Sequence, residues 1–184
     1  MYETLLRGNR RFGVLGLIVG GALTSVGIGL TCFGGQIALR GLGVANISVG
    51  VVTMFLWWQF LKQPRLAISD SELWVYIQVT KDPVRVPLEA VEVFFIGQGA
   101  VTGSVPGQTD EYKGAVAANV IVRIAERATE WHSKEVNQWL GIWQEGYITL
   151  RGLWCEDINQ ELLKKMNRKL LENKRRLRQL GEKT

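Results

Sequence analysis

The stretch FGVLGLIVGGALTSVGIGLTCF, residues 12–33, is followed after an eight-residue connector by a second uncharged run, LGVANISVGVVTMFLWWQFL, residues 42–61. At about 1.5 Å of rise per helical residue, runs of 22 and 20 residues extend about 33 and 30 Å, which matches a bilayer core of about 30 Å. The sequence therefore predicts two membrane-spanning helices that form a hairpin.

The rest of the chain is polar, so the mean hydropathy of +0.06 averages two unlike parts. We predict a cytoplasmic N-terminal segment at 1–11, a β domain at 66–151 and a C-terminal helix with a basic tail at 153–184. About 120 residues lie outside the hairpin, which is enough for one domain with its own core.

Basic residues flank the outer ends of both spans, whereas the connector, residues 34–41, carries only Arg40. Arg7, Arg10 and Arg11 precede the first span, and Lys62 and Arg65 follow the second. Short loops rich in Lys and Arg stay on the cytoplasmic side of a membrane. We therefore expect both termini and the C-terminal domain to be cytoplasmic.

Small residues indicate how the spans pack. Glycines recur every seven residues, at Gly13, Gly20, Gly27 and Gly34 in the first span and at Gly43 and Gly50 in the second. Glycine allows two helix backbones to approach closely in lipid, although it is also common in membrane helices in general. Gly21, Ser25 and Gly29 form a second row on a neighbouring face, so that one row can pack the hairpin against itself while the other meets a partner. Trp57 and Trp58 are placed as anchors at the membrane interface.

Alternating apolar residues after Pro64 predict an antiparallel β domain. We expect strands over residues 66–69, 73–79, 84–88, 91–96, 119–126, 129–132 and 147–151. The glycine-rich segment 97–114 is predicted to be a flexible loop. Helical spacing of apolar residues predicts a short helix over 134–143.

A long amphipathic helix is expected to begin near Glu156 and to close one end of the β domain. A second apolar register on this helix has the spacing of a heptad repeat, which leaves a seam for a partner helix as an alternative. Its members are Leu163, Met166, Leu170, Asn173, Leu177 and Leu180.

The segments LAISD (66–70), ELWVY (72–76) and VRVPLEAV (84–91) resemble the opening of the bacterial pleckstrin-homology-like membrane proteins that have an N-terminal two-helix anchor. The resemblance covers about a third of the domain. It implies an α+β membrane protein with a pleckstrin-homology-like β-barrel or sandwich, located in the bacterial inner membrane and acting in membrane-associated binding or assembly. The basic first hairpin of the lipid-binding members is reduced here to Lys81 and Arg85.

The sequence contains no recognisable catalytic constellation. His132 is the only histidine, and the two cysteines, Cys32 and Cys155, are far apart, so a common zinc site is excluded. Neither a nucleophile elbow nor a complete phosphate-binding or dinucleotide-binding glycine motif occurs. We therefore expect neither enzymatic activity nor a cofactor or metal.

Two clusters are candidates for binding. Trp139 and Trp143 belong to a group of four tryptophans, with Trp131 and Trp154, and we predict that one of the first two contacts a partner or the membrane surface. The basic residues Lys174, Arg175, Arg176 and Arg178 suit acidic lipid headgroups, or simply keep a helix end soluble.

The sequence thus favours a membrane-anchored, non-catalytic interaction or assembly module, an accessory subunit of a larger membrane complex. The alternative is a lipid-responsive domain that binds acidic headgroups through the C-terminal basic cluster. We expect other membrane protein subunits and membrane lipids as partners, and no nucleic acid, and a homo-oligomer stays open.

Overall fold

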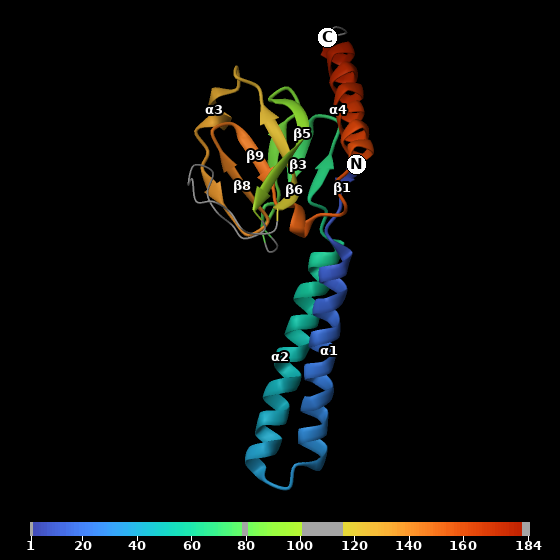
Figure 1. The fold of residues 1–184 in the computed structure, drawn as a ribbon, viewed down its shortest axis with the longest axis vertical. Helices are drawn as coiled ribbons and strands as arrows, with labels where there is room; N and C mark the ends of the chain where they lie inside the picture. Colours follow the sequence, from blue (N-terminus) through green and yellow to red (C-terminus); the bar gives the residue numbers. More distant parts are fainter. Residues whose placement is uncertain (1, 79–80, 101–115, 182–184) are drawn as a thin grey trace. The chain divides into compact units, whose positions relative to one another are not determined.

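The structure is a computed structural model that describes residues 2–78, 81–100 and 116–181 (Figure 1). It contains two compact units. Residues Asn9–Gln63 form a helical hairpin, and the segments Met1–Gly8 and Pro64–Thr184 together form an α+β domain. The hairpin is thus inserted into the sequence of the domain.

The hairpin consists of α1 (Arg10–Phe33) and α2 (Ile37–Lys62), and both helices are long and apolar enough to cross a membrane. The second helix begins five residues earlier than the uncharged run at 42–61, so the connector is only residues 34–36. Arg40 therefore lies in the first turn of α2, where its Nε donates to the carbonyl oxygen of Gly34 at 3.0 Å. Because this bond satisfies a carbonyl at the end of α1, a charged residue is accommodated at the tip of the hairpin.

Glycines bring the two helices into backbone contact. A Cβ added to Gly27 would lie 2.7 Å from the carbonyl oxygen of Gly43, and one added to Gly50 would lie 2.7 Å from that of Gly20. Gly13 instead faces a side chain, because its added Cβ would lie 2.2 Å from the side chain of Leu61. Gly16 also belongs to the packing face, although it is not a member of the predicted seven-residue repeat. A Cβ added to Gly16 would lie 2.1 Å from the ring of Trp57.

Two glycines of the predicted rows have other surroundings. Gly34 is the C-cap of α1 and does not pack within the helix pair. A Cβ added there would meet atoms of Leu30 and Leu39. An added Cβ at Gly21 or Gly29 would meet nothing within 4 Å. This second row therefore lies on a face of α1 that α2 does not cover.

The first sheet of the domain has the order β1-β2-β3-β4 and is antiparallel throughout. Its strands are β1 (Glu3–Leu6), β2 (Leu66–Ile68), β3 (Glu72–Val75) and β4 (Val84–Pro87). The prediction of a separate N-terminal segment at 1–11 is wrong, because β1 pairs with β2, with Glu3 opposite Ile68. The strand predicted over 73–79 is shorter than expected and ends at Val75.

The second sheet is also antiparallel and has the order β5-β6-β9-β8-β7. Its strands are β5 (Val91–Ala100), β6 (Val116–Ile124), β7 (Val136–Asn137), β8 (Gly141–Gln144) and β9 (Tyr147–Leu150). The flexible loop predicted for 97–114 is partly wrong, because residues 97–100 continue β5 and pair with residues 116–119 of β6. Residues 101–114 of that loop lie outside the described residues.

Two local predictions fail between β6 and β9. Residues 129–132 form a short helix, α3 (Thr129–His132), instead of a strand. The helix predicted over 134–143 is replaced by β7 and β8. The deciding feature is the Glu145-Gly146 turn, where both residues have positive φ, 51° and 78°, because such a two-residue turn favours a tight β-hairpin over a helix.

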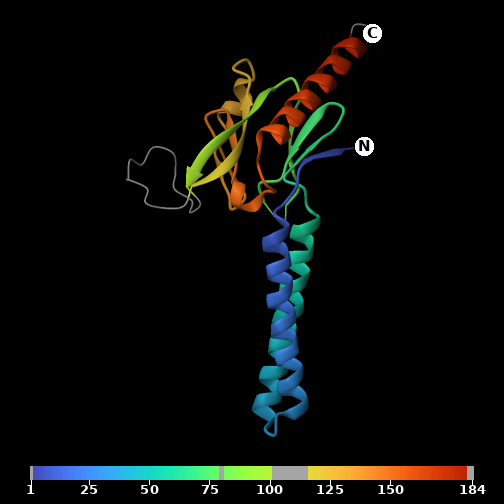
Figure 2. The same cartoon turned by 45° about the vertical axis from the view of Figure 1, so that its right-hand side comes forward.

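The C-terminal helix α4 (Gln160–Gly181) packs against the core between the sheets, and its last turns extend beyond the strands (Figure 2). Met166 and Leu170 are buried in that core. Leu163 and Leu177 also pack against it, and the side chain of Asn173 donates to the carbonyl oxygen of Ser69 at 3.2 Å. The predicted seam for a partner helix is therefore wrong over 163–177, because the chain's own domain occupies that face.

The chain leaves and re-enters the domain beside a short 3₁₀ helix, η1 (Gly152–Trp154). Arg65, which the sequence offers as a flanking positive charge, is buried there, and its Nε donates to the carbonyl oxygen of Trp154 at 3.1 Å. Burial lowers the pKa of Arg65 to about 10, and burial raises the pKa of the neighbouring Cys155 thiol to about 12. Gly8 forms a β-bridge with Cys155 at the same place.

Candidate functional site

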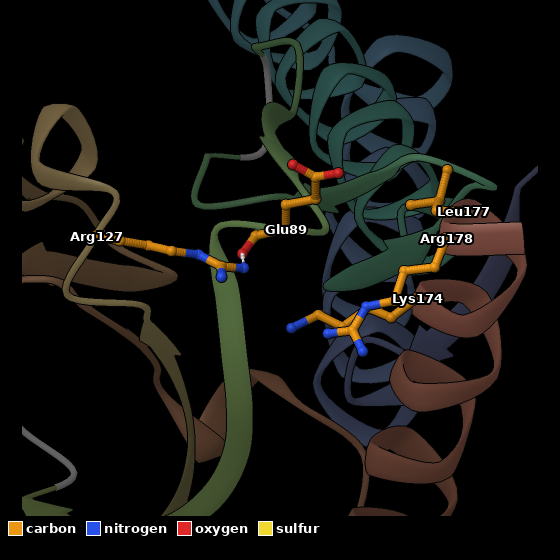
Figure 3. A pocket seen from close by; sticks show the side chains of 5 residues that line it. All are labelled: Glu89, Arg127, Lys174, Leu177 and Arg178. Atoms are coloured by element: carbon orange, nitrogen blue, oxygen red, sulfur yellow. Dashed lines mark hydrogen bonds between the residues drawn. The ribbon is translucent and has the colours of Figure 1, made fainter. Parts of the chain in front are cut away.

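A pocket of about 260 Å³ lies between the turn from β4 to β5, the turn after β6 and the C-terminal half of α4 (Figure 3). The residues that line it are Glu89, Arg127, Lys174, Leu177 and Arg178. Three separate elements supply these side chains. The pocket therefore exists only when both sheets and α4 are assembled.

The pocket is positively charged. Its lining contains three positive side chains and one carboxylate, a net charge of +2. Figure 3 shows that the Glu89 carboxylate is turned away from the ends of Lys174 and Arg178. Within the described residues, no carboxylate oxygen lies within 4.0 Å of the charged nitrogens of Arg127, Lys174 or Arg178.

Two of the three positive side chains are held by backbone carbonyls. Arg127 Nη2 donates to the carbonyl oxygen of Glu89 at 3.0 Å, and Lys174 Nζ donates to that of Val91. Burial lowers the pKa of Lys174, and the positive charges of Arg127 and Arg178 lower it further, although two nearby carboxylates oppose this effect. The positive charges thus repel one another in a partly desolvated site.

A second hollow of about 410 Å³ adjoins the pocket and shares Glu89, Arg127 and Lys174 with it. Its other carboxylates are already paired with Arg123, which lies 3.0 Å from Glu92 and 3.3 Å from Glu126. Glu92 still raises the pKa of Lys174, but burial and the positive charges of Arg127 and Arg178 outweigh this effect, so the pKa of Lys174 stays lowered.

The predicted basic cluster is divided by the helix. Lys174 and Arg178 are four residues apart, lie on one face of α4 and line the pocket. Arg175 and Arg176 are exposed and do not line it. Arg127 and Glu89 were not among the sequence candidates, because neither stands in a motif and only the tertiary fold brings them to α4.

The outer face of the second sheet has a hollow of about 450 Å³. Phe95, Ile121, Thr149 and Ile142 follow one another in a cross-strand row over β5, β6, β9 and β8. Tyr147 lies beside this row, with its ring centroid 6.3 Å from that of Phe95. These side chains are only partly buried, so an apolar strip with a polar rim faces outward.

The tryptophans separate into two pairs. Trp143 is only 1% exposed and stacks on Trp131 with centroids 5.7 Å apart, so it belongs to the core. Trp139 is 53% exposed and forms an edge-to-face pair with Trp154 at 4.5 Å. Of the two candidate partner contacts, only Trp139 is accessible.

The expected interface anchors lie in the last turns of α2. Trp57 is partly buried against α1 at Gly16, as described above. Trp58 is 50% exposed, and Lys62 Nζ lies 4.6 Å from its ring centroid. Of the two tryptophans, only Trp58 therefore lies outside the contact between α1 and α2.

His132 has a structural position, with Nε2 at 3.2 Å from the carbonyl oxygen of Ala125 and its ring against Gly146. Within the described part of the chain, no group of three or more His, Cys, Asp or Glu residues is arranged to hold a metal ion. Comparison of the sequence with family models, with curated proteins and with solved structures gives no match.

Proposed function

We propose that this chain is a membrane-anchored, non-catalytic interaction module that acts as an accessory subunit or assembly factor of a larger membrane complex. In this proposal, α1 and α2 cross the bacterial inner membrane and hold the α+β domain at its cytoplasmic surface. The domain, a pleckstrin-homology-like arrangement of two antiparallel sheets and a C-terminal helix, binds the partner.

The distribution of charge supports the orientation. Arg7, Arg10 and Arg11 precede or begin α1, and Lys62 ends α2, whereas Arg40 is the one basic residue near the connector. Since Lys and Arg favour the cytoplasmic side, both termini face the cytoplasm in this proposal.

The outer face of the second sheet is the observation that carries the proposed binding role. A row of aromatic and aliphatic side chains around an open hollow has the composition of a protein interface, where aromatic residues are enriched. Phe95 and Tyr147 supply large contact areas with few rotatable bonds, so their burial by a partner costs little conformational entropy. A protein surface of complementary apolar character is the partner that this face fits.

The first experiment concerns the anchor. Membranes that contain the full chain are washed with high salt and with alkaline carbonate, and then extracted with detergent. We expect release by detergent alone, because two apolar helices in lipid do not respond to ionic strength. Release of the intact chain by salt would refute the membrane-anchored function.

The second experiment concerns the partner surface. Ile121→Lys places a charge in the apolar strip, whereas Leu171→Lys makes the same kind of change at an exposed position on α4. We expect a membrane protein that co-purifies in fixed stoichiometry with the wild type and with Leu171→Lys to be lost from Ile121→Lys. Equal retention in both variants would show that this face is not the interface.

A further inference from the structure

We propose that Arg127, Lys174 and Arg178 form a binding site for a phosphoryl group, carried either by a soluble small molecule or by a lipid headgroup. The three positive groups point into the same space from two sides of the pocket (Figure 3). This inference does not rest on the membrane-anchored function, because it concerns a pocket within the domain alone.

Charge is the first argument. The lining has a net charge of +2, which Glu92 of the neighbouring hollow, itself sharing Arg123 with Glu126, offsets only in part at Lys174. A phosphate monoester carries about −1.5 to −2 charges near pH 7, so one such group would balance the pocket. Burial is the main cause of the lowered pKa of Lys174, and a bound phosphoryl group would offset the repulsion from Arg127 and Arg178 that lowers it further.

Donor geometry is the second argument. Arg127 and Arg178 each offer a planar fork of N–H donors, and Lys174 adds a compact ammonium to the same lining. Arginine forks match the oxygens of a phosphoryl group better than a single ammonium does, because they donate two parallel hydrogen bonds. Bonds from Arg127 and Lys174 to backbone carbonyls hold these side chains near the pocket before a ligand arrives, which reduces the entropy lost on binding.

Size is the third argument. A volume of about 260 Å³ is below the range of about 300 to 1,000 Å³ that is typical of sites for drug-sized ligands. The pocket therefore suits one compact group. The adjoining hollow of about 410 Å³ leaves room for the remainder of a phosphorylated molecule.

The test uses the full chain in an uncharged detergent, with inorganic phosphate titrated calorimetrically at constant ionic strength. We expect saturable binding in the wild type. Arg178→Gln and Arg127→Gln should each weaken it about tenfold or more, because each removes a charge-assisted contact. Arg178→Gln is the principal variant, since this exposed side chain makes no described contact that the fold requires.

Arg175→Gln and Arg176→Gln are matched controls, because they remove the same charge from the same helix outside the pocket. They should change the affinity by no more than about twofold, and these two variants and Arg178→Gln should keep the wild-type unfolding midpoint. Arg127→Gln is the less clean variant, because it also removes the bond to the carbonyl oxygen of Glu89. Membrane extraction by detergent alone should also be unchanged in Arg178→Gln, which separates failure of this site from failure of the anchor.

Short-chain dihexanoyl phosphatidic acid then distinguishes the two sources of the phosphoryl group, with dihexanoyl phosphatidylcholine as control. Binding about tenfold tighter than that of inorganic phosphate, and lost in Arg178→Gln, would assign a lipid headgroup. Equal affinities would assign a soluble phosphorylated molecule. The site is refuted if phosphate does not bind saturably, or if Arg175→Gln and Arg176→Gln weaken binding as much as Arg178→Gln.

Discussion

Truncation of Leu6 tests whether the residues before the hairpin are part of the domain core. Leu6 is 0% exposed in β1 and pairs with Leu66 of β2. Replacement of a buried leucine by alanine removes apolar burial and leaves a cavity, at a cost of about 2 to 5 kcal/mol. We take about 3 kcal/mol for Leu6→Ala, because β1 is an edge strand whose surroundings can partly relax.

Cys155 provides the assay for Leu6→Ala. Its thiol is buried, and in a Cys32→Ser background it is the one thiol left to alkylate. With a urea slope of about 1.5 kcal/mol/M, a loss of about 3 kcal/mol lowers the unfolding midpoint by about 2 M. Alkylation in the absence of urea should accelerate about 100-fold if it proceeds through global opening.

The control is Leu171→Ala, which removes the same atoms from a side chain that is 55% exposed on α4. It should change the free energy of unfolding by no more than about 0.5 kcal/mol. If Leu6→Ala lowers the midpoint no more than Leu171→Ala does, β1 does not contribute to the cooperative core and our assignment of the domain is incorrect.

Three further predictions concern the helix contact, pH and the edge of β5. The Cβ of Gly50→Leu would lie 2.7 Å from the carbonyl oxygen of Gly20, so this variant should separate the helices by about 0.7 Å or more. The detergent-solubilised hairpin should then be cut faster by protease. Gly21→Leu is the control and should leave the rate of cleavage unchanged, because an added Cβ there meets nothing within 4 Å. Cys155 has a pKa of about 12 in the fold against about 9 when exposed, so the protonated thiol stabilises the fold fully below pH 9, and this stabilisation is lost as the pH rises. Urea titrations should therefore show a free energy of unfolding that declines between pH 9 and 10 in the wild type but not in Cys155→Ala. The comparison ends at about pH 10, because above it deprotonation of Arg65 acts in the opposite direction. Asn167→Leu removes two side-chain hydrogen bonds to β5, one from the Phe94 N–H at 2.9 Å and one to the Phe94 carbonyl oxygen at 2.8 Å. Urea titration should show a free energy of unfolding that is lower by about 2 to 4 kcal/mol. A change below about 0.5 kcal/mol would contradict this prediction.

The hairpin was predictable because length and apolarity are local properties of the sequence. The runs at 12–33 and 42–61 lie within helices of 24 and 26 residues. The start of α2 was missed by five residues, because Arg40 interrupts the uncharged run but is tolerated at a helix end. Composition thus locates a span better than it locates the first turn of its helix.

Strands were harder to predict where helical and β periodicities coincide. Val136, Trp139, Leu140 and Trp143 have helical spacing, yet in the fold Trp143 points into the core from β8 and Trp139 is exposed in the preceding turn. The Glu145-Gly146 turn was the stronger signal, since a glycine with φ of 78° allows the tight connection to β9.

The candidate site was predictable only in part. The spacing of Lys174 and Arg178 puts them on one helix face, and this could be read from the sequence. Which face points to a pocket depends on the packing of Met166 and Leu170 into the core. Arg127 lies far from α4 in the sequence, so its contribution follows from tertiary structure alone.

The pairing of β1 with β2 links the stability of the domain to that of the hairpin through the chain itself. Glu3 and Ile68 are partners across 65 positions of sequence, and closing a flexible loop of that length costs about 3.7 kcal/mol in the logarithmic term alone. The antiparallel packing of α1 and α2 at Gly20 and Gly50 replaces that flexible loop with a preformed turn, since it brings the two ends of the hairpin together. Hairpin formation therefore lowers the entropic cost of adding β1 to the first sheet. It follows that a substitution which separates the helices should also weaken the β1–β2 pair, although no side chain of that pair is changed.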